Sequence, residues 1–195
     1  MKAAQTKEKI LRHTIALIQE TGGEAERVTM REIARWAGVG VGLINHYFGS
    51  KEQLTEACVQ TIVAEVISAF RPGAAPNETA LQKTKSSARQ VANFLFQNSQ
   101  LSRLSVLADM KAPAAADNTM KTVRGFAAGL AGGQPGENQL LQAFVFTAVL
   151  QVAFLRKDIA RQTLGIDLYN QQQRDAFVDY LVEGAVKNEV FNFER

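Results

Sequence analysis

The feature that most constrains this fold is the stretch from Val28 to Leu54, VTMREIARWAGVGVGLINHYFGSKEQL. Thr29 and Glu32 have the spacing of a capping box, in which the threonine oxygen accepts a first-turn N–H and the glutamate bonds back to the cap. Gly38 supplies the backbone freedom that a tight turn needs. A short helix from about Val41 to Tyr47 follows it. This order predicts a helix-turn-helix, whose second helix can enter the DNA major groove.

The rest of the chain also reads as helical, because apolar residues recur at three- and four-residue steps and no useful alternating pattern predicts a strand. The other expected helices cover residues 5–20, 51–70, 78–98, 99–111, 117–130, 137–159 and 172–191, and 161–171 reads as a connector. Proline and glycine runs at 72–76 and 131–136 read as loops. We therefore expect an all-α fold of about nine helices. A three-helix domain with the helix-turn-helix would occupy residues 1–50, and a helical bundle 51–195.

Composition limits the cellular setting. Hydrophobic residues make up 46% and charged residues 21% of the 195, as in a globular protein. The single cysteine, Cys58, allows no internal disulfide, which fits a reducing cytosol. The charged N-terminus lacks the apolar segment of a signal peptide, and the apolar run 143–155 is too short to span a bilayer. These features predict a cytoplasmic protein without a membrane partner.

No motif in the sequence points to catalysis. His13, His46 and Cys58 are too few to assemble a metal-ligand cluster. The run Gly38–Gly42 follows an amphipathic helix and lacks the spacing of a dinucleotide-binding loop. No nucleophile–base pair stands out. We expect no enzymatic activity, no metal and no cofactor, and a small helical enzyme remains only as an alternative.

Residues 29–54 resemble the DNA-binding signature of the TetR family of bacterial transcriptional regulators. The resemblance covers the capped first helix, the turn, the end of the second helix and the start of the third. The matching positions are Thr29, Ile33-Ala34, Ala37-Gly38-Val39, Tyr47-Phe48, Gly49-Ser50, Lys51-Glu52 and Leu54. It implies that residues 1–50 bind DNA and that residues 51–195 sense a ligand and form a homodimer.

The resemblance also implies individual DNA contacts. Thr29, through its hydroxyl and adjacent N–H, Tyr47 and Lys51 would bind phosphates, and Arg31 and Arg35 could add backbone contacts. The residues that would reach the groove or its rim are Gly40, Val41, Leu43, Asn45 and His46. Gly40, Val41 and Asn45 depart from the commoner serine or threonine, polar or basic residue, and tyrosine of the family. Operator specificity is therefore expected to depend on these small or neutral positions, with asparagine suited to adenine.

The core of this stretch can be built without its polar residues. The apolar positions Ile33, Ala34, Val39, Leu43, Ile44 and Phe48 already supply inward-facing side chains. An alternative interpretation, three ordinary core helices, leaves Asn45 and its two successors without a packing role. For each arginine, a plain solvated side chain is an equal alternative to a DNA contact.

The C-terminal half carries predictions for assembly and sensing. By resemblance, helices 137–159 and 172–191 form a four-helix bundle between two subunits. The interface residues would be Val149, Val152, Phe177, Tyr180, Leu181 and Gly184. The apolar run 143–155 could equally be plain core or the wall of a ligand pocket. The candidate pocket residues, each with core packing as the alternative, are Phe94, Leu104, Leu107, Met110, Met120, Phe126 and Phe144.

The sequence thus predicts a homodimeric repressor that binds a palindromic DNA operator and is released by a small ligand. Few charged residues lie in the middle helices, which favours an apolar or aromatic ligand. The alternative within DNA binding is a regulator without an effector, or one controlled by a protein partner.

Overall fold

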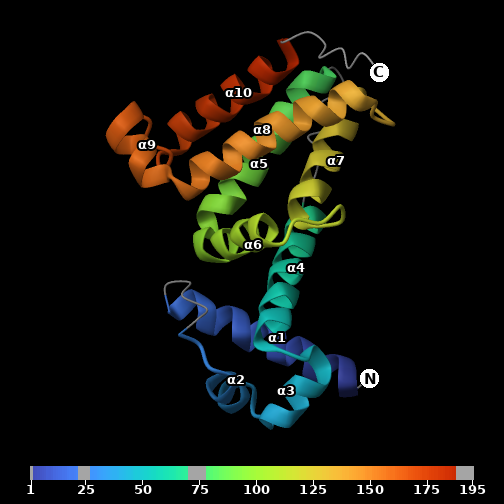
Figure 1. Ribbon diagram of the computed structural model, residues 1–195, viewed down its shortest axis with the longest axis vertical. Helices are drawn as coiled ribbons and strands as arrows, with labels where there is room; N and C mark the ends of the chain where they lie inside the picture. The colour runs from blue at the N-terminus through green and yellow to red at the C-terminus, as the bar shows by residue number, and fades with distance from the viewer. Residues whose placement is uncertain (1, 22–26, 70–77, 188–195) are drawn as a thin grey trace. The chain divides into compact units, whose positions relative to one another are not determined.

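The computed structural model describes residues 2–21, 27–69 and 78–187, and these residues form ten α-helices and no strands (Figure 1). The all-α prediction is confirmed. The helices are α1 (Lys2–Glu20), α2 (Met30–Ala37), α3 (Val41–Phe48), α4 (Lys51–Ala69), α5 (Ala80–Gln97), α6 (Ser99–Lys111), α7 (Asn118–Ala131), α8 (Glu137–Leu155), α9 (Lys157–Leu164) and α10 (Gln171–Lys187). The expected loop at 72–76 and the helical residues predicted at 70 and 188–191 lie outside the described residues.

The helices divide into two compact units. One comprises Met1–Ala69 with Asn98–Ser105, and the other comprises Phe70–Gln97 with Val106–Arg195. By packing, α4 therefore belongs with the N-terminal helices. The functional boundary that we predict after residue 50 stays a prediction.

In the first unit, α1 packs against α2 and α4, and α3 contacts both α2 and α4. Ile10, Ile33 and Ile44 are almost completely buried, and so is Leu54 at the start of α4. Burying a side chain of this size stabilises a fold by about 1.5–3 kcal/mol. These contacts fix the orientation of α2 and α3, because each helix buries its apolar side within this unit.

In the second unit, α5, α7, α8 and α10 pack against one another (Figure 1). The rings of Phe126 and Phe146 lie 4.9 Å apart at their centroids in the middle of this core. The buried cluster consists of Ala88, Ala92, Val123, Phe126, Ala127, Ala143, Phe146, Leu150, Val178 and Val182. Small residues on α5 let the large residues of α7 and α8 approach closely, which is the alternation that dense packing needs.

A row of polar contacts joins α5 to α10 beside this core. Arg89 binds Asp179 through two hydrogen bonds, with Nε to Oδ1 at 2.7 Å, and Lys85 pairs with Glu183. The hydrogen bond to Asp179 is the main cause of a raised pKa at Arg89. Partly buried pairs of this kind fix the register of two helices more firmly than exposed ones do.

Buried Arg174 extends this row with neutral acceptors. Its Nε donates to Asn93 Oδ1 at 2.9 Å and its Nη1 donates to the carbonyl of Leu168 at 2.8 Å. The guanidinium also lies 4.9 Å from the centroid of the Phe96 ring. One side chain therefore ties α10 to α5 and to the connection that precedes α10.

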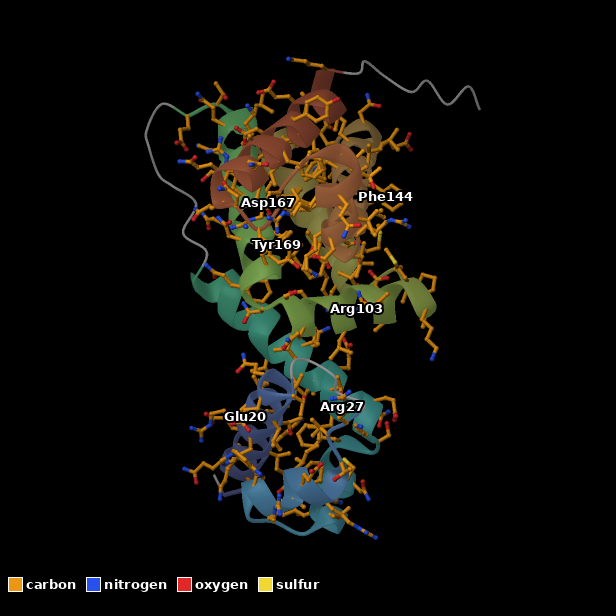
Figure 2. All side chains as sticks on the ribbon, turned by 90° about the vertical axis from the view of Figure 1, so that its left-hand side faces the viewer. Glu20, Arg27, Arg103, Phe144, Asp167 and Tyr169 are labelled. Carbon is orange, nitrogen blue, oxygen red and sulfur yellow. The ribbon has the colours of Figure 1, made fainter. Side chains whose placement is uncertain are left out.

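The end of α8 differs from the prediction. The sequence suggests one helix as far as about residue 159, but Arg156 has φ −109° and ψ 21°, which ends α8 and starts α9. Lys157 Nζ lies 4.9 Å from the Phe154 ring and 6.0 Å from the Tyr169 ring. Tyr169 also bonds back to Asp158, and its backbone N–H donates to Asp167 (Figure 2). These contacts hold α9 against the α9–α10 connection.

Among the described residues, α8 is the one helix long and apolar enough to cross a membrane by length and composition alone. Phe146, Leu150 and Phe154 on one of its sides lie in or beside the core. A core helix passes the same test, so the composition of α8 is explained by packing.

Candidate DNA-binding interface

The capping box predicted at the start of α2 is present. Thr29 has extended backbone angles, φ −94° and ψ 153°. Its Oγ1 accepts the N–H of Glu32 at 3.2 Å, and its own N–H donates to Glu32 Oε2 at 2.8 Å. The bonds from Thr29 lower the pKa of Glu32, with further help from the charges of Arg35 and Lys51.

Both hydrogen-bond donors of Thr29 are engaged with Glu32. The hydroxyl donates to Oε2 at 2.8 Å, as the backbone N–H does. A phosphate at this position has to displace the carboxylate or bind neighbouring groups. The first-turn amides of a helix have no acceptor within it, so the amides of Met30 and Arg31 are the other donors on this helix end.

The turn between α2 and α3 depends on Gly38. This residue has φ 63° and ψ 39°, in the left-handed region that favours glycine. Its N–H donates to Arg35 O at 3.2 Å, and the N–H of Val39 donates to Ala34 O at 2.9 Å. These bonds close α2 and direct the chain into Gly40, the N-cap of α3, which has φ −76° and ψ 147°.

The two sides of α3 differ sharply. Ile44 and Phe48 are buried against the core of the first unit, whereas Leu43, Asn45 and His46 are exposed. Gly42 is exposed as well, and a Cβ built on it or on Gly40 would meet no atom within 4 Å. The outer side of α3 therefore has no Asp, Glu, Lys or Arg side chain, and at Gly40 and Gly42 it has room for another molecule to approach closely. An asparagine amide and a leucine side chain there match the edges of adenine and the thymine methyl.

Two predicted phosphate-binding residues flank the end of α3. Tyr47 is half-buried, with its ring 5.5 Å from that of His46 and 6.4 Å from that of Phe48. Lys51 opens α4, where Ser50 Oγ accepts the N–H of Gln53 at 3.2 Å. Ser50 therefore caps the first turn of α4.

The outer side of α2 adds cations and one unpredicted aromatic residue. Arg31 and Arg35 are exposed, while Val41 at the start of α3 is half-buried. Trp36, which our site prediction left out, is 42% exposed. Its position could have been found from the helical pattern, because Ile33, Ala34 and Ala37 face inward and residue 36 must then face out.

The predicted pocket residues differ in how far they are buried. Phe126 belongs to the core, whereas Phe144 is 46% exposed on the outer side of α8 (Figure 2). Leu107 and Met110 are exposed on α6, and Phe94 and Met120 are half-buried. Leu104 packs within the first unit. Their role in ligand binding stays a prediction.

The predicted interface residues lie on α8 and α10, two helices that pack against each other, and three of them are exposed. On α8, Val149 is 41% and Val152 46% exposed, and Tyr180 on α10 is 73% exposed. Phe177, Leu181 and Gly184 are half-buried, and a Cβ on Gly184 would meet no atom within 4 Å. Large apolar side chains that are exposed in one subunit are candidates for a contact surface.

Comparison with known proteins agrees with the geometry of α2 and α3. The profile of a family described as bacterial regulatory proteins, tetR family, matches residues 10–58. The HTH-type transcriptional regulator BetI of Rhizobium meliloti (strain 1021) is 46% identical over 55 residues, 26% of this chain and 27% of that protein. The HTH-type transcriptional dual regulator CecR of Shigella flexneri is 40% identical over 74 residues, 38% of this chain and 32% of that protein. These alignments cover about a third or less of each relative.

Solved structures extend the likeness to nearly the whole chain. A TetR transcriptional regulator from Rhodococcus sp. RHA1 superposes with a TM-score of 0.67 at 20% identity, covering 95% of this chain and 97% of that one. A TetR-like transcriptional regulator from the same organism gives a TM-score of 0.62 at 13% identity, covering 94% and 97%. At these identities the likeness concerns the fold. The fold and the paired helices α2 and α3 define a helix-turn-helix protein. Residues 10–58 match the profile of the tetR family of bacterial regulatory proteins, and the chain as a whole shares the fold of the two solved TetR-type regulators.

Proposed function

We propose that this chain is a cytoplasmic, homodimeric transcriptional repressor that reads a palindromic operator with α3 and is released from it by a small apolar ligand. The observation that carries the DNA-binding part is the outer side of α3. Leu43, Asn45 and His46 are exposed on a helix whose opposite side is buried, and cations flank that helix on α2 and α4. The family profile over residues 10–58 supports the same function.

In the proposed complex, α3 lies in the major groove. Asn45 pairs with a base edge, and Leu43 contacts a thymine methyl. Tyr47 and Lys51 bind phosphates at one end of α3. Arg31 adds a contact through its guanidinium or its amide, because the donors of Thr29 are engaged with Glu32.

The test begins with selection of bound sequences from a random DNA pool, followed by titrations of the selected duplex at several salt concentrations. Tyr47→Phe and Lys51→Ala should weaken binding on all sequences. The logarithm of the binding constant falls linearly with the logarithm of the salt concentration, and Lys51→Ala should make this slope (the salt slope) less steep by about 0.9 per lost phosphate contact. Lys83→Ala, an exposed lysine on α5, is the matched control. Unchanged affinity and salt slope in the first two variants would contradict the assigned phosphate contacts.

Base reading is tested separately with Asn45→Ala. Loss of a bidentate base contact costs about 1–3 kcal/mol of discrimination. The variant should therefore lose preference for the selected sequence and keep its affinity for random DNA. Equal losses on both DNAs would argue against a base-reading role.

The outward apolar residues of α8 and α10 support the dimer. Two helices from each subunit would cover Val149, Val152 and Tyr180, and would place two copies of α3 about one DNA turn apart. Sedimentation of the wild type and of Val149→Glu with Tyr180→Glu tests this assembly. A dimer that persists in the double variant would exclude this surface.

Release by a ligand requires a molecule that binds more tightly to a state in which α3 cannot engage DNA. The low charge of the middle helices supports an apolar or aromatic molecule. Release of a fluorescent operator by members of an apolar compound library, without change in the dimer, is the expected result. A DNA complex that no compound or cell extract releases would favour an effector-independent regulator.

A further inference from the structure

We propose that Lys7 and Lys9 of α1 bind DNA phosphates at the two ends of α3, so that the first helix is part of the DNA-binding surface. This inference rests on the DNA-binding function proposed above. The residues expected from the family signature lie on α2, α3 and the start of α4, and α1 is otherwise explained as a packing helix.

Lys7 lies at the C-terminal end of α3. Its Nζ is 5.5 Å from the centroid of the Phe48 ring, and Phe48 is the last residue of α3. Figure 1 likewise shows the N-terminal end of α1 beside α3. Phe48 follows Tyr47 directly and is close in the chain to Lys51. Lys7 therefore joins the group proposed to bind phosphates at this end.

Lys9 lies at the opposite end of α3. Its Nζ is 3.5 Å from the position that a Cβ on Gly38 would occupy, and Gly38 forms the turn that leads into α3. The major groove is bordered by a phosphate strand on each side, and side chains at the ends of a helix in the groove reach those strands. Two exposed ammonium groups at the two ends of α3 match this arrangement.

The charge pattern of α1 points to an external anion. Within the described chain, neither Lys7 nor Lys9 has a carboxylate partner, whereas Arg12 on the same helix lies 3.9 Å from Glu8. Residues 1–12 hold four cations and one carboxylate, and exposed Glu20 lies at the other end of the helix (Figure 2). No acidic residue occupies the first turn of α1 and no basic residue the last. This distribution of charge along α1 does not complement the helix dipole. Stabilisation of α1 therefore does not explain why cations gather near its N-terminal end.

A local role is the competing explanation. An ammonium group near the C-terminal end of a helix stabilises its last carbonyls, and Lys7 also contacts a ring face. Both roles predict some loss of stability on substitution. Only phosphate binding predicts a change in how affinity depends on salt, because each neutralised phosphate releases counterions.

The experiment compares Lys7→Gln, Lys9→Gln and the double variant with the wild type and with Arg12→Gln. Affinity for the selected duplex is measured from 50 to 200 mM salt, and thermal unfolding is recorded for each protein. In a dimer each lysine occurs twice, so each single variant should make the salt slope less steep by about 1.8. Between 50 and 200 mM salt, the affinity of the variant should therefore fall by a factor about ten times smaller than the affinity of the wild type does. Arg12→Gln should keep the wild-type slope, and Lys7→Arg and Lys9→Arg should retain it.

Two outcomes overturn the inference. In one, the glutamine variants bind more weakly with an unchanged salt slope and a lowered unfolding midpoint, which assigns the lysines a structural role. In the other, they bind like the wild type. Lys51→Ala is measured alongside them: if it changes the slope and the α1 variants do not, only this inference fails. If the wild type binds no duplex at all, the proposed function itself fails.

Discussion

Three glycines within five residues of the helix-turn-helix give a test of the local structure, because alanine should change stability in a different way at each. Gly38 has a positive φ of 63° at the end of α2. Gly40 is the N-cap of α3, with φ −76°. Gly42 lies within α3, and a Cβ there would meet no atom within 4 Å. The same methyl group is therefore added to a left-handed, a capping and a helical position.

The expected magnitudes follow from these conformations. At Gly38 the added Cβ makes an ordinary contact with Lys9 Nζ at 3.5 Å, so the cost is conformational. The left-handed region costs about 1–2 kcal/mol for an L-residue. Alanine also reduces the conformational entropy of the unfolded chain, which offsets about 0.4–1 kcal/mol of this cost. Gly42→Ala should stabilise the first unit by about 0.8–1 kcal/mol through helix propensity. The two variants should differ by about 2 kcal/mol, with Gly40→Ala between them.

Urea unfolding followed by tryptophan fluorescence is the assay. Trp36 is the only tryptophan in the sequence and lies on α2, so its emission reports the first unit. With a slope of about 1–3 kcal/mol per molar urea, the midpoints of the two variants should separate by about 1 M. Circular dichroism of the same samples checks that the helical content is unchanged.

A Gly38→Ala variant as stable as the wild type, or a Gly42→Ala variant less stable than it, would contradict these expected magnitudes. A further readout separates folding from function. Gly42 faces outward on α3, so its methyl group would occupy space that the proposed complex needs. Gly42→Ala should therefore unfold at higher urea and bind the operator more weakly.

Three further predictions concern side chains away from α3. Hydrogen bonds from Lys85 and Lys187 lower the pKa of Glu183 below 4.5, so its stabilisation is present above that value and lost as pH falls through the folded pKa. Glu183→Gln should be less stable than the wild type at neutral pH, and this difference should vanish in acid unfolding curves; a difference that persists at low pH would refute it. Burial raises the pKa of Cys58 to about 12, so a thiol reagent at pH 8 should react only after unfolding, and rapid labelling of the native protein would contradict its burial. Phe146→Ala should cost about 3–5 kcal/mol in calorimetry, and a loss below about 1 kcal/mol would show that the cavity refills.

Local patterns were enough to predict the helix-turn-helix. Thr29 and Glu32 lie three residues apart as a capping box requires, and the αL turn needs a glycine where Gly38 stands. The inward positions of α3, Ile44 and Phe48, follow from four-residue spacing. Each of these features is set by residues within one or two helical turns, which is the range over which a sequence pattern is informative.

Features that depend on distant parts of the chain were not predictable. The apolar pattern continues past Leu155, and the break at Arg156 accompanies contacts between Lys157 and Tyr169 further along the chain. Apolar character alone does not distinguish buried Phe126 from exposed Phe144, because both are phenylalanines on helices of the second unit. The pattern also could not reveal that the capping role of Thr29 occupies the donors assigned to a phosphate.

Glu32 has a consequence for the energetics of the proposed complex. The N-terminus of α2 already holds an anion, because this carboxylate accepts bonds from Thr29. Its lowered pKa keeps it ionised throughout the neutral range. The carboxylate thus acts as an internal competitor, and a DNA strand gains at this helix end only the difference between binding a phosphate and binding Glu32. Such an exchange limits affinity for DNA in general, and it leaves the choice between sequences to the uncharged side chains of α3.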